Sequence, residues 1–228
     1  YNIFDEDIKK FIEPLSENIS ESIGSMGDDT PLAILSKFDR KFYDFFKQQF
    51  AQVTNPPIDS LRENSVMSLY KYLGSEDNLL NDAPTKNSAI RISTPILSLK
   101  EINDLKSFKS WFPHQEIECL YKIGSNLNSK LKVIMKNCEK SILNGNKIIF
   151  LTDQNLKLGH TPIPMLLVIS AVHHHLIEKR LRSKVSLIAV TGDVIEDHHY
   201  AALISLGASA IYPHFAYEII FKKDGEVE

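Results

Sequence analysis

Histidine and carboxylate side chains in the second half of the chain are the groups with the most obvious capacity for chemistry. Three histidines are adjacent at residues 173–175, inside an apolar run whose spacing predicts a helix. Successive side chains on a helix point about 100° apart, so three neighbouring imidazoles cannot bind one metal ion together. We therefore expect His173, His174 and His175 to have structural or interface roles.

A second group combines His198 and His199 with Asp193, Glu196 and Asp197. Asp193 and Asp197 have the i, i+4 spacing that metal-binding helices use. Carboxylates at the start of a helix are also favoured by the helix dipole. Three hypotheses therefore remain open for this group: structural histidines, a metal site, and acid–base catalysis.

Short polar turns follow three predicted strands, and ligands of parallel sheets bind at such carboxyl ends. The turns are TDQN at residues 152–155, TGD at 191–193 and YPH at 212–214. A flavin or nucleotide phosphate is held by clustered backbone N–H groups of a glycine-rich turn that opens a helix. These turns contain one glycine between them, and Asp193 would repel a phosphate. We expect no cofactor-binding residue at this edge.

The usual motifs of a nucleophile or a cofactor site are absent. The patterns GxSxG, GxxxxGK[ST], GxGxxG and CxxC do not occur in the sequence. Cys119 and Cys138, the two cysteines, are too few for a disulfide framework and lack the spacing of zinc or iron–sulfur ligands. We expect two buried or half-buried thiols, and no catalytic or metal-binding residue in this chain.

Three apolar runs separated by helices would position these groups. The runs, KIIFLTD (147–153), VSLIAV (185–190) and ASAIY (208–212), are typical of strands buried on both faces. Helices are predicted at residues 131–142, from Pro162 onward with Thr161 as the cap, and at 194–206. Parallel pairing with right-handed crossovers follows. The fold class is therefore α/β, with parallel βα repeats over about residues 94–228 that form either an open sheet or a partial, barrel-like section.

Residues 1–93 are predicted to form a mainly helical lobe that ends in a polar loop at 75–93. A short amphipathic helix near the start is expected to be kinked or ended by Pro14. A second helix begins at Ser36 and carries a stripe of phenylalanines that we expect to be core. A third helix spans residues 59–73 and is closed by Gly74.

Composition restricts the possible partners. The 228-residue chain is 43% hydrophobic and 24% charged, close to globular averages, and its formal net charge is −3. Without an excess of basic residues, nucleic acid and acidic membranes are not expected partners. No run reaches the roughly 20 apolar residues of a membrane span, so we expect a soluble protein. A first residue of Tyr1 fits a piece excised from a longer protein.

Five segments, in order, resemble the central domain of glutamate synthase. They are GSMGDDTPLAILS (24–36), FFKQQFAQVTNPPIDSLRE (45–63), TPILS (94–98), PIPMLLVISAVHHHLI (162–177) and DHHYAALISLGASAIYPHFAYE (197–218). Two turns depart from the family pattern: VTGD replaces an ESGE-like run, and TDQN replaces a more acidic SDRG-like turn. Residues 100–128 match no pattern of the family that we recognise.

The resemblance implies one internal, noncatalytic domain of a larger enzyme. In that family an N-terminal glutamine amidotransferase domain with a cysteine nucleophile releases ammonia, which passes through an internal tunnel to 2-oxoglutarate. The resulting imine is reduced to glutamate by FMN in a barrel domain that also holds an iron–sulfur cluster. The central domain resembles a degenerate copy of that barrel and binds no flavin itself. Its implied role is to link the two catalytic domains and to help form the tunnel.

The implied partners are therefore the amidotransferase and FMN-binding domains of the same polypeptide, in a soluble enzyme of the cytoplasm or a plastid. A tunnel wall needs rigid turns that present carbonyls or hydroxyls without flexing. The turn at Thr54, Asn55, Pro56 and Pro57 meets that requirement and is our candidate for a tunnel or interdomain contact. A plain connector between helices is the alternative.

Two other functions remain as alternatives. One is an autonomous partial-barrel enzyme that binds a flavin or a sugar phosphate, which predicts saturable FMN binding by the chain. The other is a metal-dependent hydrolase that uses His198, His199 and Asp193, which predicts bound metal in the purified protein.

Overall fold

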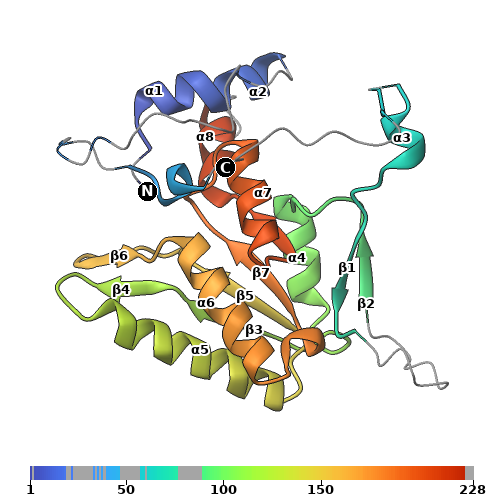
Figure 1. Ribbon diagram of the computed structural model, residues 1–228, viewed down its shortest axis with the longest axis vertical. Coiled ribbons are helices and arrows are strands. Elements are labelled where there is room, and N and C mark those ends of the chain that lie inside the picture. Colours follow the sequence, from blue (N-terminus) through green and yellow to red (C-terminus); the bar gives the residue numbers. More distant parts are fainter. Residues whose placement is uncertain are drawn as a thin grey trace.

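A four-stranded parallel sheet forms the central layer of the fold (Figure 1). The computed structural model describes residues 1, 3–18, 22, 33, 35, 37, 40–46, 57–59, 61–76 and 89–223. The strands, in spatial order, are β3 (His114–Glu118), β5 (Ile148–Thr152), β7 (Ser186–Val190) and β8 (Ala210–Tyr212). All three neighbouring pairs are parallel, and the three strands predicted from apolar runs are confirmed.

Three crossover helices cover one face of this sheet. They are α5 (Leu127–Leu143), α6 (Met165–Glu178) and α7 (Asp197–Ser205). Within β5, Ile149 and Leu151 pack against the helices, whereas Ile148 and Phe150 pack on the opposite side. All four side chains are fully buried, which explains why this strand reads as a continuous apolar run.

The opposite face is covered by α4 (Leu99–Ser107) and by a two-stranded antiparallel ribbon, β1 (Lys71–Gly74) with β2 (Ala89–Ile92). Ser98 accepts the backbone N–H of Glu101, and the Glu101 carboxylate accepts the N–H of Ser98, so a capping box starts α4. The helix α4 and the strand β3 lie in or next to residues 100–128, for which the sequence predicted no element.

The segment before α4 extends the sheet at its other edge. The N–H of Leu97 donates to the carbonyl of Ile211, and the N–H of Ile211 donates to that of Pro95, both at 2.8 Å. The four strands of this sheet, β3, β5, β7 and β8, lie side by side in the order in which they occur in the chain, and the crossover helices share one face, as in a section of a barrel. The predicted α/β fold with parallel βα repeats is confirmed, and the described residues form no closed barrel.

The predicted start of α6 is wrong. Thr161 and Pro162 belong to β6 (His160–Pro162), which pairs antiparallel with β4 (Leu120–Lys122), and the helix begins three residues later after Pro164. Pairing with a distant segment overrides the local signal of a threonine followed by proline. The adjoining helix α5 lies where it was predicted, capped by Asn126 and followed by a glycine with φ of +90°.

The N-terminal part differs more from the prediction. The first helix continues past Pro14, from α1 (Asp5–Asp7) through a π-helical turn, η1 (Ile8–Ile12), into α2 (Glu13–Asn18). Pro14 lies in the first turn of α2, where a missing N–H is tolerated.

The helix predicted over residues 59–73 is wrong. Within that range, α3 (Glu63–Val66) is a short helix, and β1 begins at Lys71 because it pairs with β2. Most of the helix predicted after Ser36 lies outside the described residues. Its described part contains a 3₁₀ turn, η2 (Phe42–Phe45), in which Tyr43 is buried while Phe42 and Phe45 are exposed, which corrects the expected phenylalanine core. Among the described residues no helix has the length and apolar character needed to cross a membrane.

Candidate functional site

Four polar side chains meet at the carboxyl end of the sheet, and we call them the carboxyl-edge cluster: Asp153, Thr191, Asp193 and His214. Asp153 follows β5, Thr191 and Asp193 follow β7, and His214 is the first residue of α8 (His214–Lys223), which comes after β8. These residues belong to the three polar turns at 152–155, 191–193 and 212–214 that follow the predicted strands. Parallel pairing brings their strand ends to one edge, which is where such sheets bind ligands.

Asp153 is almost completely buried, with 1% of its surface exposed. Its Oδ1 lies 2.8 Å from His214 Nε2 and accepts the Tyr1 hydroxyl at 3.0 Å and the Gly192 N–H at 3.1 Å. Its Oδ2 accepts the Thr191 hydroxyl at 2.5 Å. Four donors thus surround this carboxylate, which is what a buried negative charge requires.

Asp193 is only partly buried, but both its carboxyl oxygens contact protein groups. Oδ1 accepts the Tyr43 hydroxyl at 2.9 Å and lies 2.9 Å from Thr191 Oγ1, while Oδ2 accepts the backbone N–H of Met165 at 3.1 Å. Desolvation and the nearby charge of Asp153 raise the pKa of Asp193 above its usual range.

Tyr1 packs against the carboxyl-edge cluster. Its ring lies so close to Gly192 that a Cβ at that position would be 2.4 to 2.8 Å from three ring carbons. The same ring contacts Phe215, with centroids 5.5 Å apart. Desolvation and the charge of Asp153 raise the pKa of the Tyr1 phenol, so the hydroxyl remains a donor at neutral pH.

Tyr43 closes the other side of the cluster and holds the two histidines of the following helix. Its ring stacks on His199 with centroids 4.1 Å apart, and its carbonyl lies 3.1 Å from His198 Nε2. The N–H of Ile195 donates to His199 Nδ1 at 3.3 Å, and His199 Nε2 lies 3.1 Å from Glu196 Oε1. The contact with His199 lowers the pKa of Glu196. Both histidines therefore have structural partners.

The structure does not assemble a metal site from these residues. Asp193 precedes α7, which begins at Asp197, so the i, i+4 spacing does not put the two carboxylates on one helical face. Across the described residues, no group of three or more histidine, cysteine or acidic side chains has the arrangement needed to hold a metal ion.

The adjacent histidines of α6 point to three different partners, as the helical geometry predicted. His173 Nδ1 accepts the Nε–H of Arg182 at 2.9 Å, His174 Nδ1 lies 2.8 Å from the Ser170 carbonyl, and His175 Nε2 lies 2.9 Å from Glu139 Oε2. The last contact joins α6 to α5.

Most of the predicted tunnel turn lies outside the described residues. Thr54, Asn55 and Pro56 lie outside the described residues, and Pro57 is exposed. A tunnel or interdomain role for these four residues stays a prediction.

The polar groups of the carboxyl-edge cluster make their hydrogen bonds within the chain. At the strand ends the hydroxyls of Tyr1 and Tyr43 donate to Asp153 and Asp193, and the Tyr1 ring packs on Gly192. The buried thiols are poor nucleophiles, because burial raises the pKa of Cys119 well above its usual range and that of Cys138 to about 12. The carboxyl-edge cluster thus binds two tyrosines of its own chain, Tyr1 and Tyr43.

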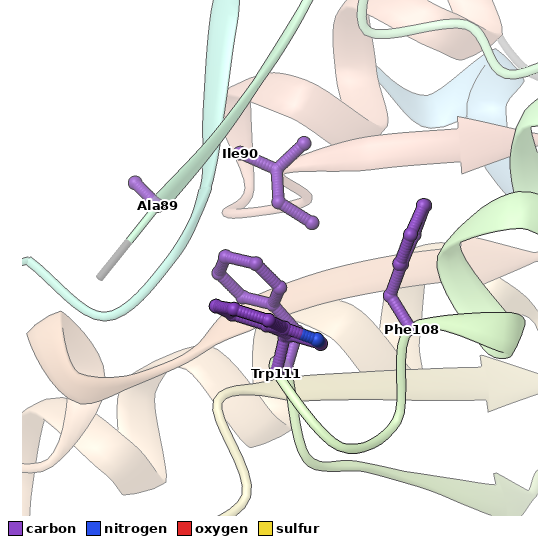
Figure 2. A pocket seen from close by; sticks show the side chains of 5 residues that line it. Ala89, Ile90, Phe108 and Trp111 are labelled. Carbon is purple, nitrogen blue, oxygen red and sulfur yellow. The ribbon is translucent and has the colours of Figure 1, made fainter. Parts of the chain in front are cut away.

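A second candidate site is an apolar pocket between the β1–β2 ribbon and the loop after α4 (Figure 2). It has a volume of about 480 Å³ and is lined by Ala89, Ile90, Phe108, Trp111 and Phe112. Phe108 and Trp111 are 51% and 62% exposed, so both present large apolar side chains to solvent beside the pocket. Such a surface fits an apolar protein partner better than a charged metabolite.

Sequence reasoning missed the two tyrosines and the pocket. Tyr1 and Tyr43 lie about 150 positions from their aspartate partners, and no local pattern marks them. The pocket is formed by residues from a region without clear periodicity, and the one available signal was a tryptophan flanked by two phenylalanines at residues 108–112.

Comparisons with known proteins agree on one family. The family model described as glutamate synthase central domain matches residues 1–228. The chain is 42% identical over 213 residues to the glutamate synthase [NADPH] large chain of Bacillus subtilis. It is 41% identical over 218 residues to the ferredoxin-dependent glutamate synthase of Pyropia yezoensis. Each of these two alignments covers 93% of this chain and 14% of the relative. It is 36% identical over 227 residues to the glutamate synthase [NADH] of Saccharomyces cerevisiae, covering 97% of this chain and 11% of the relative.

Proposed function

Because the chain belongs to the glutamate synthase central domain family, we propose that it is a noncatalytic domain that links the amidotransferase and synthase domains of a glutamate synthase large chain. It spans about one seventh of the length of the relatives, so it corresponds to one segment of such a polypeptide. The parent reaction would convert glutamine, 2-oxoglutarate and two electrons into two glutamates. FMN and an iron–sulfur cluster would be bound by the neighbouring synthase domain.

The occupied carboxyl edge carries this proposal. In a parallel sheet the strand ends are the usual ligand site, and here Tyr1 and Tyr43 fill that position and donate to the two aspartates. A sheet that binds its own chain where an enzyme would bind its substrate fits a role in joining domains.

The aromatic pocket supplies a surface for such joining. Phe108 and Trp111 expose large apolar area beside the ribbon, and large aromatic side chains are enriched at the energetically important centres of interfaces. The turn at Thr54, Asn55, Pro56 and Pro57 is a second proposed contact, where backbone carbonyls would line the ammonia tunnel.

The test measures coupling in the longer polypeptide that carries this chain. Glutamine hydrolysis and glutamate synthesis are followed in one reaction for the Trp111→Ala variant, with Leu143→Ala, an exposed residue at the end of α5, as the control. We expect more glutamine to be hydrolysed per glutamate synthesised in Trp111→Ala and an unchanged ratio in the control. An unchanged ratio in Trp111→Ala and in a Thr54→Ala/Asn55→Ala variant would refute the linking role at both contacts.

A direct binding assay separates this proposal from an autonomous flavin enzyme. The 228-residue chain is titrated with FMN, and flavin fluorescence is recorded. We expect no saturable binding, because Tyr1 and Tyr43 occupy the strand ends. Saturable binding would favour the enzyme hypothesis instead.

A further inference from the structure

The hydrogen bonds of the carboxyl-edge cluster require one more proton than its donors provide. Thr191 has one hydroxyl proton, yet its Oγ1 is within hydrogen-bond distance of Asp153 Oδ2, at 2.5 Å, and of Asp193 Oδ1, at 2.9 Å. The hydroxyl can donate to one of these carboxylates only. If both were ionised, the other would face an oxygen lone pair at close range, which is repulsive.

Placing the extra proton on Asp193 resolves the conflict. Asp153 already accepts from Tyr1 and Gly192 and lies beside His214 Nε2, so a negative charge is better stabilised there. A protonated Asp193 donates to Thr191 Oγ1, and Thr191 donates to Asp153. Asp153 and Asp193 then share one proton through the Thr191 hydroxyl.

These connected hydrogen bonds hold the segments around Tyr1 and Tyr43 against the sheet. Tyr43, only 2% exposed, donates to Asp193, and Tyr1 donates to Asp153. The two segments are also joined to each other, because Lys41 Nζ lies 3.2 Å from Asp7 Oδ2. Undocking Tyr43 and Tyr1 would therefore admit water to both aspartates at once.

We infer that the proton shared by Asp153 and Asp193 through Thr191 is a pH-sensitive latch, which fastens the segments around Tyr1 and Tyr43 to the sheet and releases them when it is lost. The inference goes beyond the proposed function and does not rest on it. Two titratable groups lie next to Asp193: Asp153, from the end of β5, and Tyr43, from η2. Tyr1 and His214 contact Asp153. His199 stacks on the Tyr43 ring and contacts Glu196.

The direction of the pH dependence follows from proton linkage. In the docked state the pKa of Asp193 is raised, whereas after undocking it should return to about 3.9. Docking is therefore strongest below the ordinary aspartate pKa. It weakens by about tenfold for each pH unit between the two pKa values and levels off above the raised one.

Peptide-resolved hydrogen exchange in the longer polypeptide that carries this chain tests the latch. Exchange rates between pH 4 and 8, corrected for intrinsic pH dependence, are compared for residues 3–12 and 40–46, with β5 (Ile148–Thr152) as the folded reference. In the wild type we expect the opening constant of both segments to rise about tenfold or more with pH while β5 stays protected. The Asp193→Asn variant imitates the protonated carboxyl and should show no such rise, whereas Asp197→Asn, an exposed control at the start of α7, should behave like the wild type.

A second variant keeps the test decisive if Asp193→Asn disturbs the fold. The Tyr43 hydrogen bond acts to lower the pKa of Asp193, so Tyr43→Phe should shift the midpoint of the transition to higher pH. A pH-independent opening constant in the wild type overturns the inference. So does an Asp193→Asn profile that follows the wild type, or a Tyr43→Phe midpoint that stays in place or moves to lower pH.

Discussion

Replacing Gly192 with alanine tests whether Tyr1 is docked as described. The new Cβ would lie 2.4, 2.6 and 2.8 Å from three carbons of the Tyr1 ring, whereas carbon atoms normally approach to about 3.5 to 4.0 Å. The ring would have to retreat by about 1 Å. That movement breaks the 3.0 Å hydrogen bond from the Tyr1 hydroxyl to Asp153.

The expected cost follows from these contacts. Gly192 does not have a positive φ, so alanine suits the backbone and the penalty is steric. Overpacking of this kind costs about 1 to 3 kcal/mol. The cost cannot exceed that of losing Tyr1 docking altogether, because the ring can swing away. The Tyr1→Ala change removes one hydrogen bond to a charged acceptor, worth about 1.5 to 3 kcal/mol, and part of a ring contact.

A double-mutant cycle isolates the interaction. Urea unfolding of the 228-residue chain gives the free energy of unfolding for the wild type, Gly192→Ala, Tyr1→Ala and the double variant. Once Tyr1 is alanine, the Gly192→Ala change should cost no more than about 0.5 kcal/mol, so the two changes are strongly non-additive. If Gly192→Ala costs the same with either residue at position 1, the clash lies elsewhere and the docking of Tyr1 on Gly192 is refuted.

Three further outcomes follow from the packing. Leu151→Ala, in the fully buried centre of β5, should lower the free energy of unfolding by about 2 to 5 kcal/mol in the same urea assay, and a loss below 1 kcal/mol would contradict that burial. Gly207→Ala should cost about 2 kcal/mol or more, because φ is +117° and the new Cβ would lie 2.3 Å from His173 Nδ1; a neutral result by thermal unfolding would disprove the contact. Cys119 and Cys138 should resist a thiol reagent at pH 8 and react once urea unfolds the chain. Their raised pKa values, about 12 for Cys138, leave almost no thiolate below pH 10, so fast native labelling would contradict their burial.

The core strands could be predicted because their signal is local. A strand buried on both faces is mostly apolar, and β5 and β7, buried at all five positions, each have four consecutive apolar residues. The edge strand β3 escaped prediction for the same reason. Two of its five residues are exposed, and its sequence, HQEIE, has no apolar run.

Local signals failed where a distant partner decides the conformation. An aspartate cap and a closing glycine predicted a helix over residues 59–73, but Lys71–Gly74 pairs with Ala89–Ile92 across a long intervening segment. Thr161 and Pro162 resemble a helix start, yet they pair with Leu120 and Tyr121. In each case the backbone hydrogen bonds of a strand replaced the local preference, and the partner could not be read from nearby residues.

The sequence by itself determined the family, the parallel α/β core and the structural character of the histidines on α6. These follow from ordered segment matches, from apolar runs and from the 100° rotation between helix neighbours, all of which are properties of the chain read along its length. Only the tertiary structure decided that Tyr1 and Tyr43 occupy the carboxyl edge and that Asp153 and Asp193 face each other across Thr191. The tyrosine contacts join residues about 150 positions apart, and the Thr191 hydroxyl meets Asp153 from 38 positions away. The energies of these contacts depend on burial and on a shared proton, which exist only once the strand ends have come together.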